Sequence, residues 1–254
     1  MNHPIRVLQW GLGAMGSGMA KLVLQKSGLK IVAAVDGRPD YVGKDLGDVL
    51  NINKVLNVTV TDQPETVLDK EKVDIVVIAT TSWTEKQMPD LRKILTAGIN
   101  VISIAEEMAA PEAQSPELAK ELDELAKQHG VSILGTGVNP GYVLDLLVVM
   151  LSGGCHNVER IEASRVNDLS PYGPTVMETQ GVGMTPEAFR AGIEAGTIVG
   201  HVGFPESIQM ISDALGLGVD RIEQIREPII SKVYRETAHV KVEPGMVAGC
   251  AHTG

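Results

Sequence analysis

The first half of the chain alternates short apolar runs with stretches in which apolar residues recur at helical spacing. The runs predict strands at residues 5–10, 30–35, 73–79, 100–104 and 131–135, and the periodic stretches predict helices near 14–27, 86–97 and 116–129. The less regular segment 37–62 is expected to cover an edge of the sheet. Strands that alternate with helices are typical of a parallel sheet covered on both faces. We therefore predict an α/β fold that begins with a Rossmann-type, doubly wound parallel sheet.

The pattern changes after residue 135, where a segment with several glycines and a proline precedes the apolar run 143–151. We expect this run to form a buried helix in which Asp145 needs a hydrogen-bonding partner. Further strands, with charged and apolar residues interleaved, are predicted at 158–168, 219–228 and 232–242, and helices from Thr185 to Gly196 and from Pro205 onward. The sequence thus predicts a Rossmann domain at 1–138 and a second, α+β domain with a mixed or antiparallel sheet at 139–254.

A glycine motif follows the first predicted strand at once and opens the first predicted helix. Gly11 permits a tight turn, Gly13 lets the backbone approach a diphosphate, and Gly16 allows the helix to pack closely. Asp36 ends the second predicted strand twenty residues after Gly16, where a carboxylate is expected to hold the ribose 2′-hydroxyl of a dinucleotide. The alternative is a glycine-rich turn without a ligand. The coincidence of strand, helix and acid favours a dinucleotide site.

Composition narrows the classes of partner. The net charge is −10 and only 3% of the residues are aromatic, which disfavours a nucleic-acid groove. No signal-type segment and no apolar run long enough for a membrane span occurs, so we expect a cytoplasmic protein without a membrane partner. Cys155, Cys250 and the six histidines show no metal-ligand spacing, and no metal site is predicted.

Ligands of a doubly wound sheet gather outside the carboxyl ends of its strands. The predicted cofactor-binding residues are accordingly Gly11, Leu12, Gly13, Ala14, Met15, Gly16, Asp36, Arg38, Thr80, Thr81, Ala105 and Glu106. Asp36 favours NAD because it repels a 2′-phosphate, whereas Arg38 can pair with that phosphate, so NAD is expected first with NADP tolerated. Ser82 and Asn139 follow other strand ends and are expected near the substrate. Ordinary turn and cap chemistry is the alternative for any one of these positions.

Charged side chains beyond the strand ends are candidates for substrate chemistry. Glu106 and Glu107 could flank a cationic substrate or a route for protons, although at most one is expected to be catalytic because neighbours on an extended chain point opposite ways. In the second domain, Arg165 could grip a carboxylate, and Asp168 or Tyr172 could bind an amine. The alternative there is a strand with an outward arginine followed by an Asp-Ser-Pro turn.

Several longer segments resemble the 2,4-diaminopentanoate dehydrogenase family of the dihydrodipicolinate reductase-like superfamily. Besides the glycine motif, they lie at 80–82, 105–108, 135–145, 165–173 and 242–249, and together they extend over most of the chain. Dihydrodipicolinate reductases themselves carry a His-His pair where this chain reads Glu162-Ala-Ser-Arg165, and related sugar dehydrogenases carry a lysine where it has Glu107. Members of the family continue beyond the position of Gly254, so the second domain is expected to be truncated at its C-terminus.

The resemblance implies oxidative deamination of 2,4-diaminopentanoate in ornithine degradation. A hydride leaves the carbon that bears the 4-amino group, and water converts the resulting imine to a ketone with loss of ammonia. The chemistry needs a group that accepts the amine proton, for which Glu107 and Asp168 are the candidates, and Arg165 would anchor the substrate carboxylate. A homo-oligomer is expected. The alternatives are a related dehydrogenase for another small amino or hydroxy acid, and an NAD(P)-binding protein without turnover.

Overall fold

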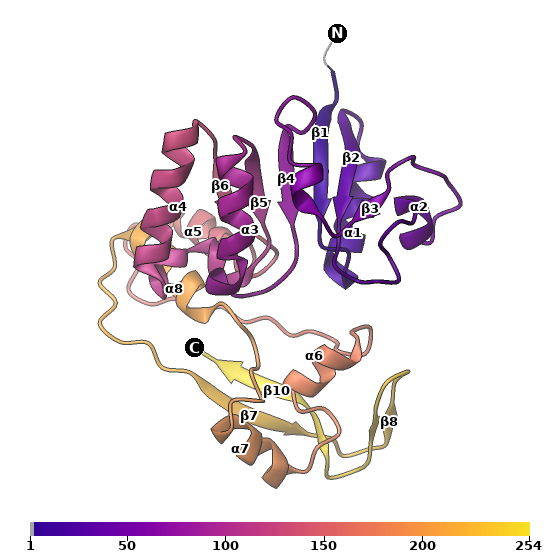
Figure 1. The fold of residues 1–254 in the computed structure, drawn as a ribbon. Helices are drawn as coiled ribbons and strands as arrows, with labels where there is room; N and C mark the ends of the chain where they lie inside the picture. The colour runs from indigo at the N-terminus through magenta and orange to yellow at the C-terminus, as the bar shows by residue number, and fades with distance from the viewer. Residues whose placement is uncertain (1–2) are drawn as a thin grey trace. The chain divides into compact units, whose positions relative to one another are not determined.

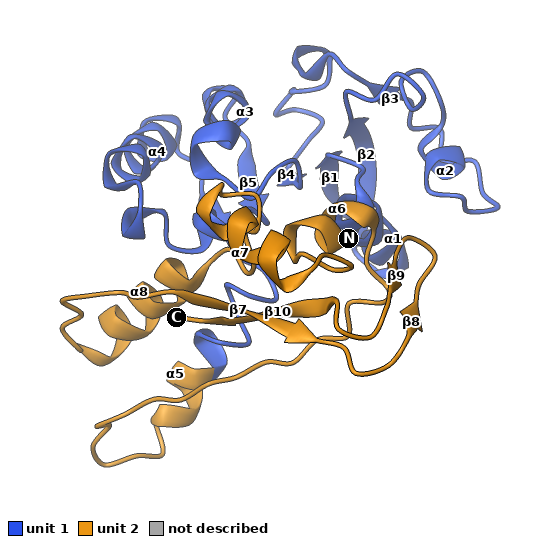
Figure 2. Cartoon of the chain, turned by 90° about the horizontal axis from the view of Figure 1, so that it is seen from below, with its two compact units in different colours: residues 1–147 blue, residues 148–254 orange. Residues whose placement is uncertain are grey.

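The computed structural model describes residues 3–254. The chain divides into two compact units, 1–147 and 148–254 (Figure 2). The division falls after Leu147, whereas the sequence places the boundary after Val138. The intervening segment stays with the first unit because hydrogen bonds link its backbone to the end of the sheet. The amide of Thr136 donates to the carbonyl of Ser103 at 3.0 Å. Within the segment, the amide of Val143 donates to the carbonyl of Val138 at 2.9 Å, and that of Leu147 to the carbonyl of Tyr142 at 2.8 Å.

The first unit is built on a six-stranded, fully parallel sheet with the order β3-β2-β1-β4-β5-β6 (Figure 1). The strands are β1 (Ile5–Trp10), β2 (Leu29–Val35), β3 (Val60–Thr61), β4 (Ile75–Ile78), β5 (Asn100–Ser103) and β6 (Ile133–Gly135). The predicted doubly wound sheet is confirmed. Because the chain runs from β1 outward on one side and then crosses to β4 on the other, the strand order switches between β1 and β4, where such folds hold their ligands.

Helices connect these strands much as the sequence predicts. They are α1 (Ala14–Gln25), α2 (Leu46–Val49), α3 (Thr84–Thr96) and α4 (Pro116–His129), with short 3₁₀ turns η1 (Pro64–Thr66), η2 (Glu106–Ala109) and η3 (Pro111–Ala113). Pro116 occupies the first turn of α4, and Gly130 ends that helix with φ = +66°. The irregular segment 37–62 supplies α2 and the edge strand β3, so its expected place at a sheet edge is confirmed.

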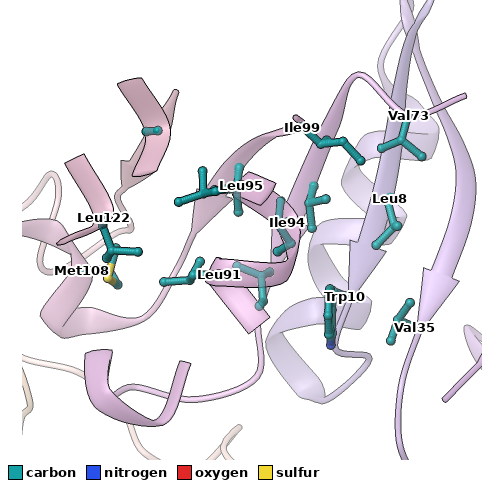
Figure 3. Close-up of a cluster of buried hydrophobic side chains, with 14 of the residues drawn as sticks. Leu8, Trp10, Val35, Val73, Leu91, Ile94, Leu95, Ile99, Met108 and Leu122 are labelled. Atoms are coloured by element: carbon teal, nitrogen blue, oxygen red, sulfur yellow. The ribbon is translucent and has the colours of Figure 1, made fainter. Parts of the chain in front are cut away.

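Two apolar clusters form the core of the first unit. Figure 3 shows the larger one, in which Leu8, Trp10 and Val35 of the strands lie near Leu91 and Ile94 of α3. The second cluster joins α1 to β2 and to the α2 region, and its buried members are Leu12, Ala20, Ile31, Ala34, Leu46, Val49, Leu50, Val58 and Val60. Because each buried aliphatic side chain contributes roughly 1.5–3 kcal/mol, these clusters hold the strand ends of the site in fixed positions.

The second unit combines helices with two small antiparallel sheets. It contains most of α5 (Leu146–Ser152), then α6 (Pro174–Thr179), α7 (Pro186–Glu194) and α8 (Phe204–Leu215), while β7 (Ile225–Ile230) pairs with β10 (Val247–Thr253) and β8 (Arg235–Glu236) with β9 (Lys241–Val242). The predicted antiparallel pairing is confirmed. Thr185 caps α7 by accepting from the amide of Ala188 at 3.2 Å, and Phe189 of α7 packs in a buried cluster with Ile198 and Val247.

Three predictions in this part of the chain are wrong. The predicted strand 232–242 is instead the hairpin of β8 and β9, whose turn is closed by the amide of Thr237 donating to the carbonyl of Val240 at 3.0 Å. Residues 158–168, predicted as a strand, form neither strand nor helix. At a period of two, Val158 and Ile161 would fall on opposite faces, and Val166 is 96% exposed.

The predicted buried helix at 143–151 begins only at Leu146, and none of the residues of α5 is buried; Met150 is 65% exposed. A helix that is apolar all round is buried only where other elements surround it. Asp145 is buried as expected and accepts from the amides of Gly141 and Leu146, at 2.8 and 2.5 Å.

None of the helices in residues 3–254 has both the length and the apolar character needed to cross a lipid bilayer.

Two histidines of the second unit lie against one phenylalanine ring. Nδ1 of His252 in β10 accepts from the backbone amide of His201 at 2.9 Å, and the ring of Phe204 stands edge-on to both imidazoles. Burial lowers the pKa of each histidine to about 4, helped by the positive charges of Arg165 for His201 and of Arg226 for His252. Both rings are therefore neutral in the folded protein at pH 7.

These shifts predict acid sensitivity of the second unit. The unfolded chain binds protons at an ordinary histidine pKa near 6.5, whereas the folded chain binds them only near 4, so stability is lost as the pH falls from about 6.5 to about 4. We expect the thermal midpoint, followed by circular dichroism, to fall across this range. His252→Asn keeps an acceptor for the amide of His201 without a titrating ring, so its midpoint should fall less steeply. Equal slopes for both proteins would contradict this explanation.

Candidate active site

The glycine motif forms the turn between β1 and α1, and its three glycines meet different surroundings. Gly11 has φ = +90°, and a Cβ there would lie 2.4 Å from the carbonyl oxygen of Ala79 at the end of β4. A Cβ on Gly16 would lie 2.0 Å from the carbonyl oxygen of Gly11, whereas a Cβ on Gly13 would meet nothing within 4 Å. Two glycines therefore allow close backbone packing, and the third leaves open space in front of the helix.

Hydrogen bonds hold the peptide groups of this turn in one orientation. Nε2 of the fully buried Gln9 donates to the carbonyl of Gly11 at 3.0 Å, and the hydroxyl of Ser17 donates to the carbonyl of Leu12 at 2.8 Å. Within residues 3–254, the amides of Gly13 to Gly16 donate to no protein acceptor. Free amides at the start of a helix are a binding site for an anion. The turn therefore fits the diphosphate of a dinucleotide.

Asp36 lies at the end of β2 beside this turn, and its side chain is 10% exposed. Its carboxylate accepts from the amide of Leu12 at 2.6 Å and from the amide and Nε of Arg38 at 2.9 and 3.1 Å. Burial by itself raises the pKa of this carboxyl, but the hydrogen bonds from Arg38 and Leu12 outweigh burial and lower the pKa below its usual range. Asp36 is thus an ionised acceptor, suited to ribose hydroxyls, next to the diphosphate turn.

Arg38 is held at three points around Asp36. Besides its bonds to that carboxylate, its guanidinium donates to the carbonyl of Leu12 and lies 3.7 Å from the centre of the Tyr41 ring. A guanidinium stacked on an aromatic ring presents a flat, positively charged face. The sequence predicts that Asp36 disfavours NADP and that Arg38 favours it. The structure places these two side chains in direct contact.

The ends of β4 and β5 meet at the same edge of the sheet. The amide of Glu107 donates to the carbonyl of Ser82 at 3.2 Å, and Oε2 of Glu107 accepts from the amide of Thr84 at the start of α3 at 2.7 Å. Thr81 accepts from the amide of Trp83 at 3.3 Å, a local turn contact. Predicted site residues from two strand ends are thereby brought together, with the carboxylate of Glu107 at the first turn of α3.

The third strand end is packed against the second. A Cβ on Gly135 would lie 1.6 Å from the carbonyl oxygen of Met108, so the end of β6 lies directly against η2, which also contains Glu106. Ala105 at the entry to η2 is buried. Asn139 lies in the following loop and is partly exposed. The three strand ends thus form one edge of the first unit.

Sequence reasoning missed three buried polar residues at this edge, namely Gln9 in β1, Gln87 in α3 and Ser103 in β5, each fully buried. A signal was present in each case, because a polar residue interrupts an apolar run or occupies the inner face of a helix. The partners of these side chains could not be read from that signal.

The remaining predicted residues belong to the second unit, where they are exposed. Asp168 accepts from the amide and hydroxyl of Ser170 at 2.9 and 2.7 Å, and these bonds lower the pKa of its carboxyl. This geometry matches the Asp-Ser-Pro turn of the alternative interpretation. Tyr172 follows in the same turn, and Arg165 lies before it in a segment without helix or strand. The roles proposed for Arg165, Asp168 and Tyr172 stay predictions.

Residues 3–254 contain no group of three or more histidine, cysteine or acidic side chains that could hold a metal ion.

Comparisons with known proteins agree with this geometry. Residues 5–77 match the family model of the dihydrodipicolinate reductase N-terminus, and residues 142–254 match that of the 2,4-diaminopentanoate dehydrogenase C-terminal domain. The 2,4-diaminopentanoate dehydrogenase of Acetoanaerobium sticklandii is 46% identical over 98% of this chain and 71% of its own length. An amine dehydrogenase of Streptomyces virginiae is 27% identical over 87% of the chain and 62% of its own length.

A solved structure extends the likeness to three dimensions. The amine dehydrogenase of Mycobacterium smegmatis superposes with a TM-score of 0.81 at 30% identity, over 99% of this chain and 75% of that protein. The resemblance identified from the sequence is confirmed, and the relatives are dehydrogenases. The chain is an oxidoreductase, and it belongs to the 2,4-diaminopentanoate dehydrogenase family.

Proposed function

We propose that the chain catalyses the NAD(P)-dependent oxidative deamination of 2,4-diaminopentanoate to 2-amino-4-oxopentanoate, with release of ammonia, as a step of ornithine degradation. The 46% identity to a 2,4-diaminopentanoate dehydrogenase over almost the whole chain carries this proposal. The open turn at Gly13 and the ionised Asp36 support the use of a dinucleotide. A homo-oligomeric assembly stays a prediction, which light scattering would test.

The reaction assigns a task to each predicted residue. A bound nicotinamide ring supplies an acceptor for the hydride that leaves the amine-bearing carbon. The amine must also lose a proton, and Glu107 or Asp168 accepts it. Water then adds to the imine carbon, and the carbon–nitrogen bond breaks to give the ketone and ammonia. In the first unit, Asn139 and Ser82 are assigned to the substrate chain. In the second unit, Arg165 is assigned to the substrate carboxylate and Tyr172 to the substrate amine.

The direct test mixes purified protein with 2,4-diaminopentanoate and NAD, and in parallel NADP. We expect the absorbance of reduced nicotinamide to appear together with an equal amount of ammonia. Turnover of a different amino or hydroxy acid, or of simple amines alone, would transfer the function to another substrate of the superfamily. Dinucleotide binding without turnover of any of these compounds would favour a non-catalytic protein.

Asp36→Ala should change the preference between the two dinucleotides. Removing the carboxylate deletes an acceptor for the ribose diol and frees Arg38 for a 2′-phosphate. We expect kcat/KM for NAD to fall by about tenfold or more, equivalent to the loss of roughly 1.4 kcal/mol, and kcat/KM for NADP to fall less or to rise. Asp48→Ala, an exposed position in α2, is the control. An unchanged NAD-to-NADP ratio would refute the role of Asp36.

A further inference from the structure

A chain of polar side chains runs through the apolar layer between α3 and the sheet. Nε2 of Gln87 donates to Oγ1 of Thr80 at 3.4 Å, and Oε1 of Gln87 accepts from the hydroxyl of Ser103 at 2.5 Å. The oxygen of Ser103 in turn accepts from the amide of Ala105 at 3.1 Å. Gln87 and Ser103 are fully buried. The chain therefore joins the end of β4, the inside of α3 and the end of β5.

Packing of α3 does not require an amide at this position. The neighbouring inner positions, Met88, Leu91 and Ile94, are apolar and almost fully buried, and a buried amide is stabilising only when its hydrogen bonds are made. A side chain of similar length without polar atoms would fill the same space. The polar atoms of Gln87 therefore act through their hydrogen bonds to the ends of β4 and β5.

One of those ends lies directly against the diphosphate turn. A Cβ on Gly11 would lie 2.4 Å from the carbonyl oxygen of Ala79 and 3.3 Å from Cγ2 of Thr80. The position of residues 79 and 80, directly after β4, therefore limits where the turn after β1 can lie. The other end leads through Ala105 into η2, where Glu106 and Glu107 lie.

We propose that Gln87 is a positioning residue for the dinucleotide site. It touches neither substrate nor cofactor. By holding Thr80 and Ser103 at a fixed separation, it sets the ends of β4 and β5 relative to the glycine turn, so that the two ends receive the nicotinamide half of the dinucleotide in one geometry. This inference rests on the proposed use of NAD or NADP.

The test compares Gln87→Met, which keeps the length of the side chain and removes both hydrogen bonds, with Gln128→Met, an exposed position of α4. Dissociation constants for NADH and NADPH are measured by tryptophan fluorescence, and thermal midpoints by circular dichroism. We expect Gln87→Met to weaken dinucleotide binding by about tenfold, or roughly 1.4 kcal/mol. Its KM for the dinucleotide should rise more than its kcat falls, and Gln128→Met should match the unaltered protein.

Two further arms keep the outcome decisive. If Gln87→Met does not fold, Ser103→Ala removes the other end of the same chain with little change in volume and should weaken binding in the same direction. In the double variant Gln87→Met/Thr80→Val, the second substitution should weaken dinucleotide binding less than Thr80→Val does alone, because both substitutions remove the same hydrogen bond. A changed thermal midpoint with unchanged dinucleotide affinity in these variants would overturn the inference. Failure of the unaltered protein to bind either dinucleotide would instead refute the proposed function.

Discussion

We expect Gly16→Ala to weaken dinucleotide binding strongly and to destabilise the first unit. The new Cβ would lie 2.0 Å from the carbonyl oxygen of Gly11, and neither atom belongs to a side chain that can rotate away. Helix α1 must therefore move away from β1, and the free amides at its start move with it. We expect the dissociation constant for NADH to rise at least about hundredfold. The free energy of unfolding should fall by about 2–3 kcal/mol, the cost of overpacking a closely packed site.

The same helix offers a matched control. A Cβ on Gly18 would meet nothing within 4 Å, so Gly18→Ala places the same methyl group on α1 without a clash. Alanine is the better helix former, and this variant should be more stable by about 0.5–1 kcal/mol with unchanged dinucleotide binding. Retention of NADH binding by Gly16→Ala would show that α1 is not held against Gly11 as described, and would remove the physical basis of the dinucleotide site.

The sequence predicts the first unit well because local signals there agree with one another. Apolar runs predict β1, β2, β4, β5 and β6, while β3 lies in the segment expected only to cover a sheet edge. Gly130 ends α4, and Asp36 follows the glycine motif at the expected distance. The three glycines are predictable in kind, since only a residue without Cβ fits at Gly11 and Gly16. Such features depend on neighbours close in the chain or on the general rule that parallel strands end at one edge.

The parts that the sequence does not predict depend on partners far along the chain. Gln87 is read as one polar residue in an amphipathic helix, and its contact with Ser103 appears only once β5 lies beside α3. The amide of Thr84 is a free group at a helix start until Glu107, 23 residues later, accepts from it. In the second unit, the local pattern of the segment 158–168 predicts a strand because charged and apolar residues are interleaved. The alternation is too irregular to give one buried face, and the segment forms no strand.

Glu107→Gln should separate the chemistry of this carboxylate from its structural contact. Oε2 accepts from the amide of Thr84 at 2.7 Å, and Oε1 accepts a long hydrogen bond from Nε2 of Gln114 at 3.5 Å. Because the bond to Oε1 is the weaker of the two, Oε1 is the oxygen assigned to take the proton. A glutamine amide oxygen can still accept from Thr84 but cannot act as a base. We therefore expect kcat for deamination to fall by roughly 10²–10⁴, with the thermal midpoint and the dissociation constant for NADH unchanged.

Two companion variants decide between the candidate bases. Glu107→Ala removes the acceptor as well, so the amide at the start of α3 loses its partner; it should lower kcat as much as Glu107→Gln does and also reduce the thermal midpoint. Asp168→Asn keeps the turn contact with the amide of Ser170 and should leave kcat close to that of the unaltered enzyme if Glu107 is the base. The reverse pattern, with full turnover by Glu107→Gln and loss in Asp168→Asn, would assign the proton to Asp168. Glu107 would then only fasten the end of β5 to α3, because its contact with Thr84 does not depend on which acid takes the proton.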